Sequence, residues 1–161
     1  MKSISSLDEY FMTTALKQAL KAAQSGDVPV GVVIVKDDKI IAKGYNQVEK
    51  LNDSTAHAEI IAIKKAFKKL HYKHLEGCSI YVTLEPCSMC AGALVLARIE
   101  RLILGAYDPK AGACGSLYNI IDDNRLNHRL KITNGILADE CSRIISQFFM
   151  DLRNKNKQAQ E

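Results

Sequence analysis

The sequence predicts a single α/β domain, with a mixed five-stranded sheet and helices on both of its faces. Helical and strand-like hydrophobic patterns alternate along the chain, which is typical of this class. Two consecutive strand patterns lie so close together that they must form a hairpin, so the sheet contains an antiparallel pair. The length of 161 residues fits one domain with an adequate core. We therefore expect one domain over residues 1–161, with residues 154–161 as a flexible polar tail.

The first helix and the hairpin account for residues 7–45. Apolar side chains recur at helical spacing over residues 7–25, and Gly26 and Pro29 then end the helix. Strands are expected at residues 30–35 and 40–45, on either side of a short polar turn. These segments therefore form a helix followed by a β-hairpin.

The remaining elements follow the same alternation. We expect helices at residues 56–70, 87–97 and 138–153, and strands at residues 79–84, 102–106 and 131–136. A loop is expected at residues 47–52 and a turn-rich loop at residues 107–112. The helix at 87–97 is apolar on all sides, which indicates burial, in part against a second subunit. Gly31, inside the first strand, indicates either close approach by a ligand or another backbone, or a β-bulge, and the sequence leaves both open.

Composition excludes few functions. Hydrophobic content of 47% and charged content of 25% are ordinary for a globular protein, and the net charge of +4 permits an acidic partner such as RNA without requiring one. No apolar run reaches the roughly 18 residues of a membrane span, and residues 1–9 lack a signal-peptide apolar region. Five cysteines, two of them closely spaced, indicate reduced thiols and a metal-binding pair rather than disulfides. We therefore expect a cytoplasmic protein.

Two short stretches carry the chemistry, His57-Ala58-Glu59 and Pro86-Cys87-Ser88-Met89-Cys90. One imidazole and two thiolates form a suitable ligand set for Zn²⁺, and three protein ligands leave the fourth tetrahedral position for water. Zinc lowers the pKa of such a water to about 7. We expect His57, Cys87 and Cys90 to bind zinc and Glu59 to move protons.

Both stretches are expected at helix N-termini. Ser54 and Thr55 are N-cap candidates for the helix that contains His57, and Pro86 suits the first position of the helix that contains the cysteines. The helix dipole favours negative charge there, so Cys87 and Cys90 should ionise readily.

Other readings of the cysteine pair are weaker. A lone Cys-x-x-Cys also occurs in redox sites and in structural zinc sites, where His71 and His74 would be the added ligands. The His71–His74 spacing is shorter than structural zinc sites use, and the redox reading gives no role to His57 and Glu59. The other thiols, Cys78, Cys114 and Cys141, are expected to be small buried hydrophobic residues.

The signature His-x-Glu followed by Pro-Cys-x-x-Cys resembles that of the zinc-dependent nucleobase and nucleoside deaminases. Over about residues 7–153 the chain is similar to the bacterial tRNA wobble adenosine deaminases of that superfamily. The similar segments are residues 28–31, 55–59, 81–87, 89–93, 105–110, 115–117, 127–129 and 137–141. The resemblance implies a cytidine-deaminase-like three-layer α/β/α fold.

The same resemblance implies hydrolytic deamination of the first anticodon base of a tRNA, from adenosine to inosine. It implies a homodimer with one zinc ion per subunit, bound to a tRNA anticodon stem-loop, and no DNA or membrane partner is expected. It assigns zinc to His57, Cys87 and Cys90 and proton transfer to Glu59. The residues that it implies for substrate binding are Asn46 at the target base, Asp108, Lys110, Asn127, Phe149 and Arg153 at the anticodon loop, and Val30, Ala58 and Leu84 in the pocket.

Two rival functions remain open at this point. A deaminase of a free base or nucleoside, of the guanine or cytosine type, would use the same zinc chemistry on the same fold. A zinc-stabilised RNA-binding module without activity would need four protein ligands and no exchangeable water. Without tryptophan, base stacking would depend on Tyr107, Tyr118, Phe148 or Phe149, and core packing is the competing role for the two phenylalanines.

Overall fold

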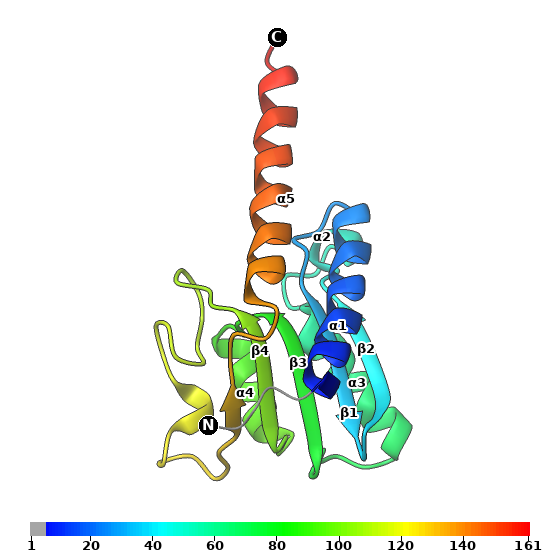
Figure 1. The fold of residues 1–161 in the computed structure, drawn as a ribbon, viewed down its shortest axis with the longest axis vertical. Coiled ribbons are helices and arrows are strands. Elements are labelled where there is room, and N and C mark those ends of the chain that lie inside the picture. The colour runs from blue at the N-terminus through cyan, green and yellow to red at the C-terminus, as the bar shows by residue number, and fades with distance from the viewer. Residues whose placement is uncertain (1–5) are drawn as a thin grey trace.

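The computed structural model describes residues 6–161, so residues 1–5 of the segment inspected for a signal peptide lie outside it. Figure 1 shows the helices and strands around a central sheet. In chain order they are α1 (Ser6–Gln24), β1 (Gly31–Lys36), β2 (Lys39–Tyr45), α2 (Val48–Leu51), α3 (Ala58–Leu70), β3 (Cys78–Leu84), α4 (Ser88–Leu96), β4 (Arg101–Ala106), the 3₁₀ turn η1 (Ile120–Asp122), β5 (Lys131–Thr133) and α5 (Ala138–Gln158).

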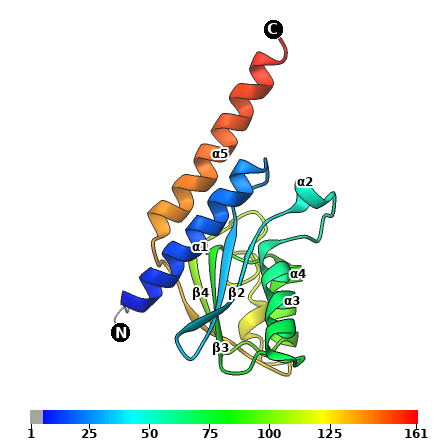
Figure 2. The same cartoon turned by 90° about the vertical axis from the view of Figure 1, so that its right-hand side faces the viewer.

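The five strands form one mixed sheet in the order β2-β1-β3-β4-β5. β1 is antiparallel to β2 and to β3, whereas β3 with β4 and β4 with β5 are parallel. Helices α1 and α5 cover one face, and α3 and α4 cover the other (Figures 1 and 2). The predicted fold class, a three-layer α/β/α arrangement with a mixed five-stranded sheet, is confirmed.

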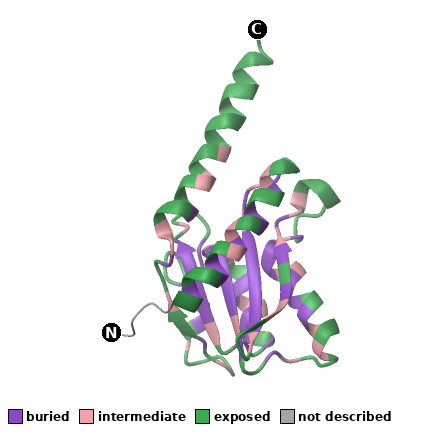
Figure 3. Ribbon diagram, turned by 45° about the vertical axis from the view of Figure 1, so that its right-hand side comes forward, coloured by how far each residue is buried: buried purple, intermediate pink, exposed green. Residues whose placement is uncertain are grey.

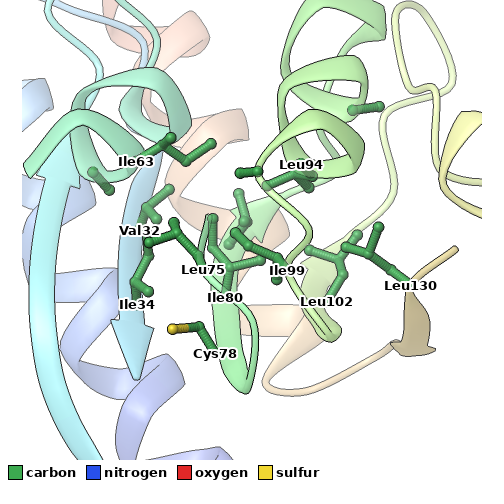
Figure 4. Packing of buried hydrophobic residues seen from close by; sticks show 14 of the residues in the cluster. Val32, Ile34, Ile63, Leu75, Cys78, Ile80, Leu94, Ile99, Leu102 and Leu130 are labelled. Atoms are coloured by element: carbon green, nitrogen blue, oxygen red, sulfur yellow. The ribbon is translucent and has the colours of Figure 1, made fainter. Parts of the chain in front are cut away.

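Each face of the sheet has its own hydrophobic core. Val32 and Ile34 of β1 point to the side of α3 and α4, while Val33 and Val35 point to the side of α1. This alternation follows from the two-residue period of a strand, and burial on both faces explains the uninterrupted apolar run. The strands are the most buried part of the chain (Figure 3). Figure 4 shows the packing of Ile63 and Leu94 from the two helices against the strands.

Gly31 is required by the close approach of α1. A Cβ atom there would lie 1.9 Å from the Ala15 carbonyl oxygen and 2.5 Å from the Ala19 nitrogen. Of the alternatives that the sequence left open at Gly31, close approach by another backbone is therefore correct. The irregularity in the β1–β2 register lies elsewhere, between Ile34 and Val35.

The expected loop at 47–52 is wrong in part, because it contains the single-turn helix α2. The carboxylate of Asp27 accepts hydrogen bonds from the backbone N–H groups of Glu49 (2.6 Å) and Lys50 (3.2 Å). Asp27 thus satisfies N–H groups at the start of the helix from 22 residues away, and no local pattern signals such a contact.

The expected helix caps are also wrong. His57 is the N-cap residue of α3, and neither Ser54 nor Thr55 has that position. Thr55 instead donates its N–H and hydroxyl to Asp53, in a turn before the helix. Cys87 is the N-cap residue of α4, so Pro86 precedes the cap and is not the first helical residue. In both helices a candidate metal ligand occupies the cap position.

The C-terminal elements differ in length from the expectation. β5 ends at Thr133 rather than at residue 136, and η1 was not predicted. Helix α5 runs past Arg153 to Gln158, so residues 154–158 belong to an exposed helix that projects from the body of the molecule (Figure 1). Residues 154–161 contain no glycine or proline to stop the helix earlier. Among residues 6–161 there is no helix with the length and apolar character needed to cross a bilayer.

Candidate metal centre and substrate pocket

Three potential zinc ligands converge where α3 and α4 begin. The Nδ1 atom of His57 lies 3.6 Å from the sulfur of Cys87 and 3.5 Å from that of Cys90. All three donor atoms lie within 4.8 Å of one another. In a tetrahedral zinc site, bond lengths of about 2.3 Å to sulfur and 2.0–2.1 Å to nitrogen place the two kinds of ligand about 3.6 Å apart. The residues therefore fit one zinc ion without rearrangement.

The fold creates this convergence from residues 30 positions apart. β3 ends at Leu84 and leads directly into the cap of α4, while α3 starts beside it on the same face of the sheet (Figure 2). The backbone of Ser54 lies close enough to the His57 ring to contribute to its raised pKa.

The protonation of the thiols reflects their mutual contacts. Hydrogen bonds from Cys90 and then from His57 lower the pKa of Cys87 to about 3. The pKa of Cys90 is raised, because it donates to Cys87 and is buried. The pKa of His57 is raised mainly by its contact with Cys87. Cys87 is therefore the thiol of the pair that ionises more readily, and zinc binding to both sulfurs would displace their protons.

Glu59 lies beside this cluster and is 4% exposed. Burial raises the pKa of its carboxyl group, and the Cys90 side chain opposes this by a smaller amount. It is not one of the three residues whose donor atoms converge. A buried carboxyl group next to the metal ligands, but outside their set, is suited to accept and return protons.

A pocket of about 610 Å³ opens over the centre, and His57, Glu59 and Cys87 form part of its wall. Six of the residues expected to bind substrate line this pocket, namely Val30, Asn46, Ala58, Leu84, Asp108 and Phe149. The other three, Lys110, Asn127 and Arg153, are exposed and lie outside the pocket wall. The structure thus brings six of the nine expected residues to one cavity.

Asn46 is oriented by the backbone around it. Its Nδ2 donates to the Val28 carbonyl at 3.1 Å, and its Oδ1 accepts from the Val48 N–H at 3.4 Å. An amide nitrogen carries two N–H groups, so one donor remains for a ligand in the pocket. Asn46 therefore has the chemistry expected of a residue that contacts a base.

The sequence did not single out several residues that shape the pocket. Asp27, which is fully buried, and Glu85, which is 3% exposed, both line it, as do Val48 and Glu49 of α2. Hydrogen bonds from Ser116, Asp108 and Cys114 lower the pKa of Glu85 against the opposing effect of burial. Glu85 could have been found from the sequence, because it is a carboxylate directly after an apolar strand. A charged group that is buried there needs partners, so its position indicates a structural or functional role.

Comparison with known proteins identifies the family. The cytidine and deoxycytidylate deaminase zinc-binding region matches residues 5–106 of the chain. The chain belongs to this deaminase family. It is 53% identical to the tRNA-specific adenosine deaminase of Aquifex aeolicus (strain VF5) over 146 residues, which cover 91% of this chain and 96% of that protein. It is 46% identical to the tRNA-specific adenosine deaminase of Bacillus subtilis (strain 168), over 96% of each chain.

Solved structures of this deaminase family agree with the sequence comparisons. A structure described in a study of A-to-I editing by tRNA:A34 deaminases at the wobble position superposes with a TM-score of 0.81 at 42% identity. It covers 84% of this chain and 98% of its own. The family expected from the sequence is confirmed. The expectation of a zinc-dependent hydrolytic deaminase with one zinc ion per chain is also confirmed, because the family is zinc-binding and the three ligands fit that ion.

Proposed function

We propose that this protein hydrolyses the adenosine at the first anticodon position of a tRNA to inosine, with release of ammonia. The observation that carries the proposal is Glu59 beside the His57, Cys87 and Cys90 cluster, in the wall of a pocket with room for a base. The whole-chain similarity to relatives named tRNA-specific adenosine deaminase supports the choice of substrate.

Zinc held by the three ligands supplies a Lewis acid, which makes water nucleophilic at neutral pH. The carboxylate of Glu59 takes a proton from the water that attacks C6 of adenine and delivers it to N1. It then passes the second proton of that water to the departing amino group, which leaves as ammonia. One carboxylate thus acts as base and then as acid, and its burial keeps bulk water from replacing it.

The pocket suits an adenine base that is already unstacked. Val30, Ala58 and Leu84 offer apolar contact to its faces, and Asn46 offers an N–H donor to its edge. An adenine inside a helix cannot reach such a pocket, whereas the loop of an anticodon presents single-stranded bases that can be splayed out. A loop substrate therefore agrees with the shape of the site.

The residues outside the pocket would contact the rest of the anticodon loop. Lys110 follows Asp108 on the loop that forms part of the pocket wall, and Arg153 lies on α5 one turn after Phe149. Both carry positive charge that can meet phosphates. Asn127 is exposed on the segment that precedes β5, where its amide can hydrogen-bond to RNA. We propose these three as RNA contacts rather than as residues that select the reacting base.

We also propose that the protein forms a homodimer in the cytoplasm. Helix α4 leaves Leu96 79% exposed and Met89 36% exposed, so part of its apolar surface lacks cover in one chain. A second copy of the chain could cover it, as the all-apolar sequence of this helix suggests. All five cysteines are free, which suits a reducing compartment.

The test is a substrate panel with purified, zinc-loaded protein. An anticodon stem-loop with adenosine first in the anticodon should yield inosine, detected by mass spectrometry of the digested RNA. Guanine and cytidine should not be deaminated, and a stem-loop with the adenosine moved into the stem should stay unmodified. Deamination of guanine or cytidine without inosine in the RNA would replace this proposal with that of a free-base or nucleoside deaminase.

A further inference from the structure

Glu85 is the buried carboxylate that follows β3, two residues before Cys87. Both of its oxygens are occupied by donors from a loop more than 20 residues further along the chain. Oε1 accepts the Asp108 N–H at 3.0 Å and the Ser116 hydroxyl, and Oε2 accepts the N–H groups of Cys114 and Ser116, each at 3.0 Å. A carboxylate has about four acceptor sites, and here all are used.

The loop that supplies these donors, residues 107–116, is shaped to fit the carboxylate. A Cβ atom at Gly112 would lie 2.2 Å from the carboxyl carbon of Glu85 and within 2.4 Å of both oxygens. Only glycine therefore permits the loop to pass this close. The Ala113 N–H adds a hydrogen bond of 2.8 Å to the Pro86 carbonyl, which joins the loop to the same segment.

The two segments joined in this way form adjoining parts of the substrate pocket. Leu84, Glu85 and Cys87 line it from the strand end, while Asp108 and Ala111 line it from the loop. Asp108 is itself oriented, because its Oδ1 accepts the Lys110 N–H at 3.0 Å and the Ala111 N–H at 3.3 Å. The place of Asp108 relative to the metal ligands therefore depends on the hydrogen bonds to Glu85.

We propose that Glu85 is a positioning residue, whose carboxylate clamps loop 107–116 onto the metal-binding segment and so sets the wall of the pocket that receives the substrate. Glu85 acts through the loop and need not touch the reacting atoms. The identity of the substrate rests on the proposed function, whereas the clamp rests only on the contacts of this chain.

Glu85→Gln tests the clamp with little change in shape. The amide replaces one acceptor oxygen by an N–H₂ donor, and in either orientation it faces at least one backbone N–H that then has no acceptor. Amide hydrogen exchange at Asp108, Cys114 and Ser116 should accelerate about tenfold or more. Zinc content should stay at one per chain, because the three ligands are unchanged.

Glu85→Gln should weaken substrate binding more than it slows the chemical step. We expect the KM for an anticodon stem-loop to rise about tenfold while kcat changes less than about threefold, because the loop wall contributes binding rather than proton transfer. Ser116→Ala, which removes one side-chain donor and leaves the carboxylate, should change exchange and KM in the same direction by a smaller factor. This milder variant keeps the test open if Glu85→Gln folds poorly.

Asp8→Asn is the matched control. Asp8 is also a buried carboxylate, 4% exposed, but it meets Tyr81 and Arg101 on the α1 side of the sheet, away from the pocket. It should lower stability without changing loop exchange or KM. Unchanged exchange in Glu85→Gln, or faster exchange with an unchanged KM, would overturn the inference. If the wild-type protein makes no inosine, the proposed function fails, and the clamp then stands or falls on the exchange data.

Discussion

Replacing Glu59 by glutamine should abolish turnover while the zinc site stays intact. Glutamine has nearly the same shape but cannot carry the proton from water to N1 and then to ammonia. General acid–base catalysis contributes about 10²–10⁴-fold per step, and Glu59 acts in two steps. The other two buried carboxylates of the pocket, Asp27 and Glu85, already accept backbone N–H groups and cannot substitute. We therefore expect kcat to fall at least about 10⁴-fold, or about 5.5 kcal/mol of transition-state stabilisation.

Although kcat should fall, the free energy of unfolding of metal-free Glu59→Gln should stay the same or rise. Burial raises the pKa of Glu59, so the folded state binds the proton more tightly than the unfolded state does. The stability that this group contributes is present below its unfolded pKa and is lost as pH rises through its folded pKa. At neutral pH the buried carboxylate is therefore a cost that glutamine lacks, and metal-free Glu59→Gln should unfold at the same or a higher denaturant concentration.

The assay for Glu59→Gln combines single-turnover formation of inosine in an anticodon stem-loop with metal analysis of the same preparation. We expect one zinc per chain and no measurable product over many wild-type half-lives. A fully metallated variant that retains more than about 1% of the wild-type rate would refute the proton-shuttle role, since general acid–base catalysis alone is worth more than that. Loss of zinc would instead show that the carboxylate helps to hold the metal.

Three further predictions follow from the structure. Cys87→Ser should lower zinc affinity at least about tenfold, because a hydroxyl is a poor substitute for a thiolate, and dialysis followed by metal analysis should show less than one zinc per chain; full retention would contradict the ligand assignment. Gly31→Ala should destabilise the protein by at least about 2 kcal/mol, because its methyl group meets the Ala15 and Ala19 backbone of α1; a shift in the urea midpoint near zero would show that α1 does not pack as described. Burial raises the pKa of Cys141 to about 12 from an ordinary value near 9. The stability that this thiol contributes is therefore complete below pH 9 and is lost as pH rises through 12, by about 1.4 kcal/mol per pH unit. Under reducing conditions Cys141→Ala should lose stability less steeply than the wild type between pH 9 and 11, and equal slopes would contradict this.

Periodicity and residue chemistry were sufficient to predict the layers and the metal ligands. Local patterns mark β1, the turn after it and α3. The predicted bounds of these elements therefore lie within two residues of the observed ones. His57, Cys87 and Cys90 were found because imidazole and paired thiols in this spacing have few other uses. Their convergence needs only that two helices start at the same end of the sheet.

Features fixed by long-range contacts could not be predicted in the same way. The start of α2 depends on Asp27, and the loop at 107–116 depends on Glu85, each more than 20 residues away in the sequence. The N-cap of α3 is His57 rather than Ser54 or Thr55, although serine and threonine are better intrinsic caps. At α2 and at loop 107–116, tertiary hydrogen bonds override local preference, and residues from all three places line the pocket.

The most direct test of the account is X-ray absorption at the zinc edge of the purified protein. We predict a four-coordinate ion with two sulfur ligands at about 2.3 Å and two nitrogen or oxygen ligands at about 2.0–2.1 Å, one of them an exchangeable solvent oxygen. Cys87→Ser should reduce the sulfur count by one. A site with three or four sulfur ligands, or one saturated by four protein ligands, would contradict the proposal that this chain activates water for deamination.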